Sequence, residues 1–454
     1  MRILLILLSF LLGVQTAAAS LNQLVDYGGY LVEVDGQTIA SLRPDERFIP
    51  ASSIKVLSAL TILRTLGEDY RFATNFYYDQ KTGVLSVKGS GDPFLTSEVL
   101  AQAAAQLREK GVRRVSRLVL DDSAFALRQE LPDGSENTSQ PYDTGNNALA
   151  VNFNTVVFRK DAKGELFQED PNTPLLPITR ELAASATSGA QRINIYSGGT
   201  TTVSPALRHT AELLISLLRQ AGIEVEDSAR RSLVAAGAKP ILTIQSEQPM
   251  REMVRSFLKY STNFVANQLT LTAAAQRFGS PATWEKEKML LEEVAYQQLA
   301  LSPRDLQITE GSGLSRHTHV SPRAMLTILR AFEPWKELLP EKSGALVKTG
   351  TMTGVSCLAG YKETPQGLAR FAILLNQHRN TRWEVLHDLL DPPDPTPTPV
   401  VAKSKHSGKH SAKGKHSGKH VAKGKHSGKH VAKAKSKADT KKVAAKKSKK
   451  ARSR

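Results

Sequence analysis

The sequence predicts an α+β fold: an antiparallel sheet flanked by helices, with a large inserted domain and a disordered C-terminal tail. Three observations support this prediction. Strand-like runs occur near both ends of the folded part, and helical periodicity dominates the stretch before the later strands. The chain beyond residue 404 has almost no large apolar residues. Strands from both ends can therefore join one sheet, while the insertion forms a domain of its own.

The first residues have the composition of a secretory signal. Arg2 supplies a positive charge, residues 3–14 form an apolar run, and Ala17–Ala19 provide a small-residue cleavage site. The apolar run is shorter than the roughly 20 residues that a membrane-spanning helix needs. We therefore predict that residues 1–19 are a signal peptide and that the protein is exported, to the periplasm or the cell envelope.

The first folded segment has the pattern of a hairpin followed by a helix. Residues 30–34 and 38–42 are strand-like runs around Asp35-Gly36, which is a typical hairpin sequence. From Ser52 to Leu66, apolar residues recur at helical spacing. This spacing predicts an amphipathic helix.

The middle of the chain differs from both ends. Residues 71–240 contain strand-like pieces broken by polar loops, and helical periodicity resumes at Met250. Strand-like runs return from Ala345 to Leu375, before a proline-rich stretch that cannot extend a helix. We predict these boundaries: signal peptide 1–19, a discontinuous main domain 20–70 and 241–391, an inserted domain 71–240, a Pro-rich linker 392–404, and a disordered Lys/His-rich repeat tail 405–454.

The positive charge is concentrated in the tail. Residues 401–454 hold 20 of the 61 Lys and Arg residues and one acid, so they carry +19, whereas residues 1–400 carry −1. A polycation of this kind can bind polyanions, including nucleic acid. The export signal argues against nucleic acid. We expect the tail to contact anionic wall polymer or a membrane surface.

Three short motifs contain residues suited to serine acyl transfer: Ser52-Ser53-Ile54-Lys55, Ser261-Thr262-Asn263 and Lys348-Thr349-Gly350. Each type of motif occurs a second time. The second copies are Ser256–Lys259, Ser135–Asn137 and Lys81–Gly83. The motifs must therefore be chosen by their context.

Ser52 and Lys55 lie at the start of the predicted helix, where a spacing of three places both side chains on one face. The helix N-terminus and limited solvent both favour a neutral amine, so Lys55 can accept the serine proton. We predict that Ser52 is the nucleophile and Lys55 its base. Ser256–Lys259 lies late in its helix, where the dipole favours a charged lysine.

Ser261 and Asn263 lie in a short connection between two predicted helices. In a site of this chemistry, Ser261 relays a proton toward the leaving amine, and Asn263 holds Lys55 and a substrate carbonyl. An ordinary helix cap explains the same residues equally well.

Lys348, Thr349 and Gly350 end a strand-like run. At a sheet edge that lines a cleft, an ammonium and a hydroxyl can bind a terminal carboxylate, and a glycine lets the backbone approach closely. The N–H groups of Ser52 and Thr351 are the expected oxyanion hole.

In their order, these motifs resemble the penicillin-binding family of serine D-Ala-D-Ala carboxypeptidases, which share a fold with class A β-lactamases. The likeness is greatest to the low-molecular-weight carboxypeptidase/endopeptidase type, in which a large extra domain separates the first two motifs. It extends over most of residues 20–390 through these short matches: Pro50–Ser52, Gly89–Pro93, Val119–Ser123, Val151–Asn154, Gly311–Arg316 and Leu358–Tyr361.

The resemblance implies a β-lactamase/DD-peptidase-like main domain that acts on peptidoglycan stem peptides. Ser52 is then acylated by the penultimate D-Ala, the terminal D-Ala leaves, and water hydrolyses the acyl-enzyme. β-Lactam antibiotics acylate the same serine. Some relatives also cut D-Ala-meso-diaminopimelate cross-links, and the sequence leaves both activities open. Thr262 stands where Asp is common in this family. No cofactor or metal is expected.

Two alternative functions also account for parts of this pattern. A class A β-lactamase carries a Glu-x-x-x-Asn element between the second and third motifs, but no Asn occurs between Asn267 and Lys348. The other alternative is a wall-binding or polyanion-binding protein built on a catalytic-type scaffold. Truncation at Pro392 tests this alternative. An enzyme with an attached tail should keep its hydrolytic activity after the truncation.

Overall fold

The computed structural model describes residues 21, 23–197 and 203–391. The predicted signal peptide, Pro-rich linker and repeat tail lie outside these residues. In the described part of the chain, no helix is both long and apolar enough to cross a membrane.

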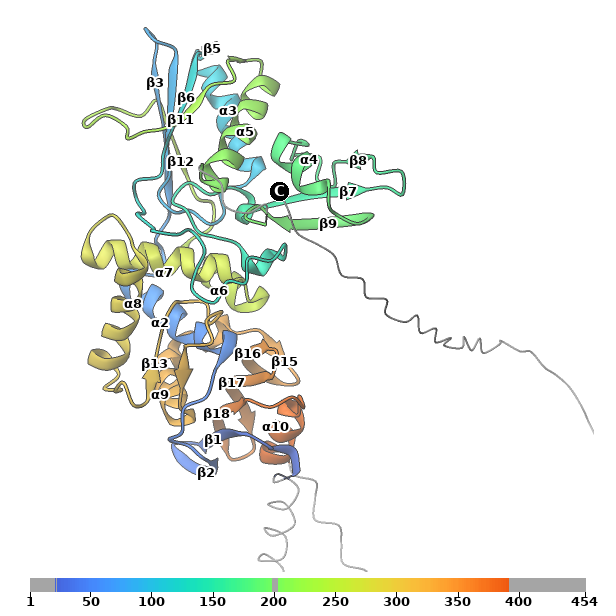
Figure 1. Cartoon of the computed structure of the whole chain (residues 1–454). Coiled ribbons are helices and arrows are strands. Elements are labelled where there is room, and N and C mark those ends of the chain that lie inside the picture. The colour runs from blue at the N-terminus through green and yellow to red at the C-terminus, as the bar shows by residue number, and fades with distance from the viewer. Residues whose placement is uncertain (1–20, 22, 198–202, 392–454) are drawn as a thin grey trace, which may run out of the picture. The chain divides into compact units, whose positions relative to one another are not determined.

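The main sheet is antiparallel, and its strands come from both ends of the described chain (Figure 1). Strand β1 pairs with β18 from Gly28↔Leu375 to Val34↔Ala369, which confirms the predicted pairing of the first hairpin with the late strands. The α+β fold class is also confirmed. In spatial order, the six strands are β15 (Glu341–Lys342), β16 (Ala345–Met352), β17 (Val355–Thr364), β18 (Gly367–Leu375), β1 (Gly28–Val34) and β2 (Gln37–Leu42).

Both faces of this sheet are covered. Along β17, Cys357, Ala359 and Tyr361 belong to the core shared with the central helices. Leu358 points to the other face and packs in the cluster that contains Leu386 of α10 (Arg382–Leu390). This alternation is the period of two expected for a strand. On the adjacent strand β16, one face therefore lies toward the central helices and the other toward α10.

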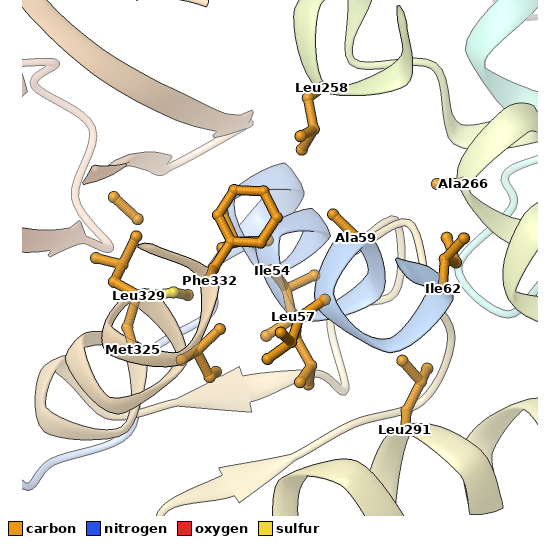
Figure 2. Close-up of a cluster of buried hydrophobic side chains, with 14 of the residues drawn as sticks. Ile54, Leu57, Ala59, Ile62, Leu258, Ala266, Leu291, Met325, Leu329 and Phe332 are labelled. Atoms are coloured by element: carbon orange, nitrogen blue, oxygen red, sulfur yellow. The ribbon is translucent and has the colours of Figure 1, made fainter. Parts of the chain in front are cut away.

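Helix α2 (Lys55–Leu66) is at the centre of the main core (Figure 2). A short 3-10 helix, η1 (Ala51–Ile54), precedes it. The predicted amphipathic character is wrong, because every residue from Lys55 to Leu63 is buried. The reason is tertiary, since later helices surround α2. These are α6 (Met250–Tyr260), α7 (Asn263–Phe278), α8 (Trp284–Glu292) and α9 (Pro322–Phe332).

Smaller elements complete this part of the fold. They are the π-helix η4 (Glu293–Gln298), the 3-10 helix η5 (Glu333–Leu338), and the paired strands β13 (Leu306–Gln307) and β14 (His319–Val320).

The segment between α2 and α6 has its own hydrophobic core, drawn from residues 76–242. Its largest sheet has the order β11-β6-β4-β3-β12, with Ala229–Arg231, Arg117–Asp121, Val84–Lys88, Ala73–Asp79 and Leu242–Gln245. A second sheet has the order β8-β7-β9, with Leu166–Phe167, Thr155–Lys160 and Gly189–Asn194, and a third pairs β10 (Glu224–Val225) with β5 (Arg114–Val115). The helices are α3 (Ser97–Glu109), α4 (Pro177–Ala183), α5 (Pro205–Gln220), η2 (Pro141–Asp143) and η3 (Asn152–Asn154).

The predicted boundary at residue 240 falls just before β12, which pairs with β3. Because this pairing belongs to the sheet of the insertion, we propose that the inserted domain continues to Gln245. The main-chain N–H groups of Ser246 and Met250 donate to the carbonyl oxygens of Phe72 and Tyr70. These hydrogen bonds join the two chain segments that connect the inserted domain to the main domain.

Candidate active site

Ser52 lies in a tight turn that presents it to solvent. It is partly exposed, whereas its neighbours Ala51 and Ser53 are buried. Ala51 has a φ of 47°, in the left-handed region that is costly for a residue with a side chain. Two glycines make room for this turn. A Cβ at Gly350 would lie 2.2 Å from the carbonyl oxygen of Pro50, and one at Gly313 would lie 2.3 Å from that of Ala51.

Lys55 is completely buried, and its amine contacts the serine hydroxyl. The Nζ atom lies 2.9 Å from Ser52 Oγ, 2.7 Å from Asn263 Oδ1 and 2.5 Å from the carbonyl oxygen of Ser312. Burial lowers the pKa of Lys55 to about 7, although the negative charge of Glu310 acts in the opposite direction. The amine is therefore neutral in a large fraction of molecules near neutral pH.

The loop that supplies the Ser312 carbonyl is held by the buried side chain of Glu310. Its carboxylate accepts hydrogen bonds from the main-chain N–H groups of Ser312, Leu314 and Ser315, and from the Ser312 hydroxyl. These bonds satisfy the carboxylate and fix the loop next to Lys55.

The second motif lies at the junction of α6 and α7. Ser261 follows the end of α6 with a φ of 58°, and Asn263 begins α7. Ser261 Oγ accepts a hydrogen bond from Lys348 Nζ at 2.7 Å. Asn263 Nδ2 donates to the carbonyl oxygen of Tyr142 at 2.9 Å, so a residue of the inserted segment fixes the amide that contacts Lys55.

The third motif lies on β16, where Lys348 is 1% exposed. Its Nζ also donates to the main-chain oxygen of Thr349 at 2.9 Å. Burial lowers the pKa of Lys348 well below its ordinary value, and the nearby positive charge of Lys55 adds to this effect. An anion bound beside Lys348 would favour its charged form again.

Thr349 and Thr351 alternate with Lys348 and Gly350 along the strand, so their side chains belong to the other face of β16. The Thr351 hydroxyl accepts a hydrogen bond from Arg382 at 2.7 Å. Among the described residues, neither threonine hydroxyl is hydrogen-bonded to the side chains of Ser52, Lys55 or Ser261.

The structure thus brings Ser52, Lys55 and Asn263 into one hydrogen-bonded group, with Ser261 and Lys348 as a bonded pair beside it. Gly350 lies against the turn that carries Ser52. The second copies of the motifs lie elsewhere: Lys259 is exposed at the end of α6, Lys81–Gly83 forms the turn between β3 and β4, and Ser135–Asn137 lies in a loop.

Three groups that contact the site were not predicted from the sequence. The carbonyl oxygens of Ser312 and Tyr142 act through the main chain, so the residue type carries no signal. Ser312 does fall in the glycine-rich match Gly311–Arg316. Arg382 belongs to no motif, and its contact with β16 depends on how α10 packs.

A serine hydroxyl bonded to a buried lysine, with no histidine between them, is an arrangement used by serine-type hydrolases. Residues 28–342 match the D-Ala-D-Ala carboxypeptidase 3 (S13) family, and the chain belongs to this family. It is therefore a serine-type peptidase, which confirms the family resemblance found in the motifs.

Individual relatives agree with this assignment. The chain is 26% identical over 410 residues to a D-alanyl-D-alanine carboxypeptidase of an Actinomadura species, covering 76% of each chain. It is 23% identical over 395 residues to the D-alanyl-D-alanine carboxypeptidase DacB of Haemophilus influenzae, covering 73% of this chain and 81% of that one. The crystal structure of penicillin binding protein 4 from H. influenzae has the same fold, with a TM-score of 0.69 at 20% identity, covering 82% of this chain and 97% of that one.

Proposed function

We propose that this peptidase removes the terminal D-Ala from peptidoglycan stem peptides through an acyl-enzyme on Ser52. One observation supports this assignment most strongly. A fully buried Lys55 amine, whose pKa is lowered to about 7, lies 2.9 Å from the Ser52 hydroxyl. This distance is within the range for direct proton transfer from the nucleophile to its base.

In the proposed acylation step, the neutral Lys55 amine takes the proton from Ser52 as Oγ attacks the carbonyl of the penultimate D-Ala. The oxygens of Asn263 and Ser312 accept hydrogen bonds from Nζ and orient its lone pair toward the hydroxyl. Ser261, which is bonded to Lys348, then relays the proton held by Lys55 to the departing nitrogen of the terminal D-Ala, so that the amino acid leaves as an amine and Lys55 is neutral again. In the hydrolysis step, Lys55 takes a proton from the attacking water and returns it to Ser52 Oγ as the shortened peptide leaves as a carboxylic acid.

Substrate binding is assigned to β16 and the Ser52 turn. Among the described strands, only β17 pairs with β16 at the third motif, so a ligand along the other edge can meet side chains from both faces of the strand. At this edge, Lys348 and Thr349 are assigned to the terminal carboxylate, and Asn263 to a peptide carbonyl. Gly350 allows close approach of the strand, because any Cβ there would collide with Pro50. The N–H groups of Ser52 and Thr351 stabilise the oxyanion.

The same attack on a β-lactam amide leaves the drug bound to Ser52, so we expect β-lactams to be covalent ligands. A related structure of H. influenzae penicillin binding protein 4 contains a β-lactam. Cleavage of D-Ala-meso-diaminopimelate cross-links requires the same acyl-enzyme and differs only in the leaving amine. Endopeptidase activity is therefore part of the proposal.

The proposal predicts steady release of D-Ala from diacetyl-Lys-D-Ala-D-Ala by the purified enzyme. With nitrocefin, we expect a burst of about one equivalent followed by slow turnover, because the acyl-enzyme accumulates. Colorimetric D-Ala detection and stopped-flow absorbance measure the two reactions. Rapid, sustained nitrocefin hydrolysis without D-Ala release would instead identify a β-lactamase.

We also propose that the enzyme is exported with residues 1–19 removed, and that its tail attaches it to anionic wall polymer or membrane headgroups. The charge of +19 in residues 401–454 supports this attachment, since the rest of the chain carries −1. N-terminal sequencing of the secreted protein tests the cleavage, which should leave Ser20 first.

Truncation before Pro392 should leave D-Ala release unchanged and abolish salt-sensitive retention on isolated cell-wall sacculi, because the attraction is electrostatic. The matched control keeps the length of the tail but replaces its lysines with glutamine, and it should also lose retention. Vesicles with anionic lipid, compared with sacculi, distinguish the two surfaces. Loss of hydrolysis on truncation would contradict the division into enzyme and tail.

A further inference from the structure

Arg382 reaches the proposed oxyanion hole from the face of the sheet opposite Ser52. It is the first residue of α10, which packs on that face. Its Nη1 atom lies 2.9 Å from the carbonyl oxygen of Gly350 and 2.7 Å from Thr351 Oγ1. The guanidinium therefore contacts Gly350, the last residue of the third motif, and Thr351, the residue that follows it.

The start of α10 is fixed independently of this contact. Gln377 Nε2 donates to Thr381 Oγ1 at 3.0 Å, and Thr381 Oγ1 donates to the carbonyl oxygen of Leu24 at 2.6 Å. Val385 and Leu386 are buried against the sheet. The start of α10 is thus attached by contacts that do not involve the Arg382 side chain.

The described residues provide no carboxylate that pairs with the charge of Arg382. Neighbouring arginines form ion pairs, Arg370 with Glu333 and Arg379 with Asp26, but within residues 21, 23–197 and 203–391 Arg382 forms none. It is half-buried, and its Nε is a buried donor without a partner in the described part of the chain. Burial of an unbalanced cation costs stability, so a gain in stability from ion pairing does not account for the position of Arg382.

The Gly350 carbonyl and the Thr351 N–H are the two ends of one peptide unit. This unit is trans, so the two groups point in opposite directions. A cation bound at the oxygen orients the peptide plane and polarises the unit, which makes the N–H a stronger donor. The Thr351 N–H is the group assigned to the oxyanion hole above.

We infer that Arg382 is a positioning residue that orients and polarises the Gly350–Thr351 peptide and thereby strengthens the oxyanion hole. The inference rests on the proposed acyl-enzyme mechanism. Arg382 lies on the face of the sheet opposite Ser52. It acts through the Gly350–Thr351 peptide on the negative charge that develops at the scissile carbonyl oxygen. Its contribution is thus greatest in the transition state.

The test measures the oxyanion hole directly in full-length protein. Acyl-enzymes are formed with a penicillin carrying ¹³C at the β-lactam carbonyl, and difference infrared spectra give the stretching wavenumber of the ester carbonyl. Arg382→Met removes the charge and the donors while keeping an extended side chain. We expect roughly tenfold slower acylation, less than complete loss of an oxyanion donor would cause, and a shift of the carbonyl to higher wavenumber.

Two further variants separate a structural effect from the proposed one. Arg382→Lys keeps the charge and should restore part of the acylation rate and of the wavenumber. Arg379→Met removes an exposed arginine three residues earlier, which pairs with Asp26, and should change neither. Thermal melting identifies the variants that fold.

The wavenumber decides the outcome. If it is unchanged in a folded Arg382→Met protein, the inference is overturned, even when acylation is slower, because packing damage slows the reaction without weakening that hydrogen bond. If Arg382→Met does not fold, Arg382→Gln, which also removes the charge, decides on the same criterion. Failure of the wild-type protein to form the ester at all would instead overturn the proposed mechanism.

Discussion

The Ser52→Ala variant should form no covalent adduct with labelled penicillin, and its release of D-Ala should fall by roughly 10⁴-fold or more. The reason is that alanine offers no oxygen to carry the acyl group, while the rest of the site remains in place. Intact-protein mass spectrometry measures the adduct, and digestion of the wild-type acyl-enzyme should locate it in the peptide that contains Ser52.

The matched control for this variant is Ser256→Ala, taken from the second Ser-x-x-Lys sequence. Ser256 lies on α6 beyond the hydrogen bonds of the site, so acylation should proceed at the wild-type rate. An adduct that persists in Ser52→Ala, or that maps to the Ser256 peptide, would show that the wrong motif had been chosen.

The Lys55→Met variant should lose acylation by roughly 10³-fold, within the range contributed by a general base. Methionine fills most of the buried space but cannot accept the serine proton. The loss also leaves the oxygens of Asn263 and Ser312 without their donor, which costs stability of about 1–3 kcal/mol for each buried group. Stopped-flow acylation kinetics and thermal melting separate the two effects.

The pH dependence of the wild-type enzyme identifies the group that Lys55→Met removes. The pKa of Lys55 is lowered to about 7, and only the neutral amine accepts a proton. The acylation rate should therefore rise with pH and level off above that value, and about one unit below it only about a tenth of the amine remains neutral. Lys259→Met, at an exposed position, should keep this profile. A rate that is flat through the region around pH 7 would rule out Lys55 as the base.

The motif residues could be predicted from the sequence because their chemistry depends on side-chain type. A hydroxyl and an amine spaced by three residues indicated Ser52 and Lys55, and helix context favoured them over Ser256 and Lys259. The pairing of the first hairpin with the late strands was also predictable, because alternation and turn residues marked both. The fold class followed from these elements.

Other features were not predictable, because they depend on packing between distant segments. Helix α2 has an amphipathic pattern over part of its length, yet helices far away in the sequence cover it on all sides. The carbonyl of Tyr142 contacts Asn263 through the main chain, and any residue there has a carbonyl. The position of Arg382 depends on the packing of α10, so no local sequence pattern indicates its contact with Gly350.

The pairing of β1 with β18 also affects when the enzyme can become active during its synthesis. Ser52 and Lys55 are translated early, but the sheet that supports them is incomplete until residues 367–375 have been added. Asn263 and Lys348 likewise arrive late. A growing polypeptide therefore carries Ser52 and Lys55 without the Asn263 amide that orients the base and without the binding strand, and it stays inert until nearly the whole folded part has been made.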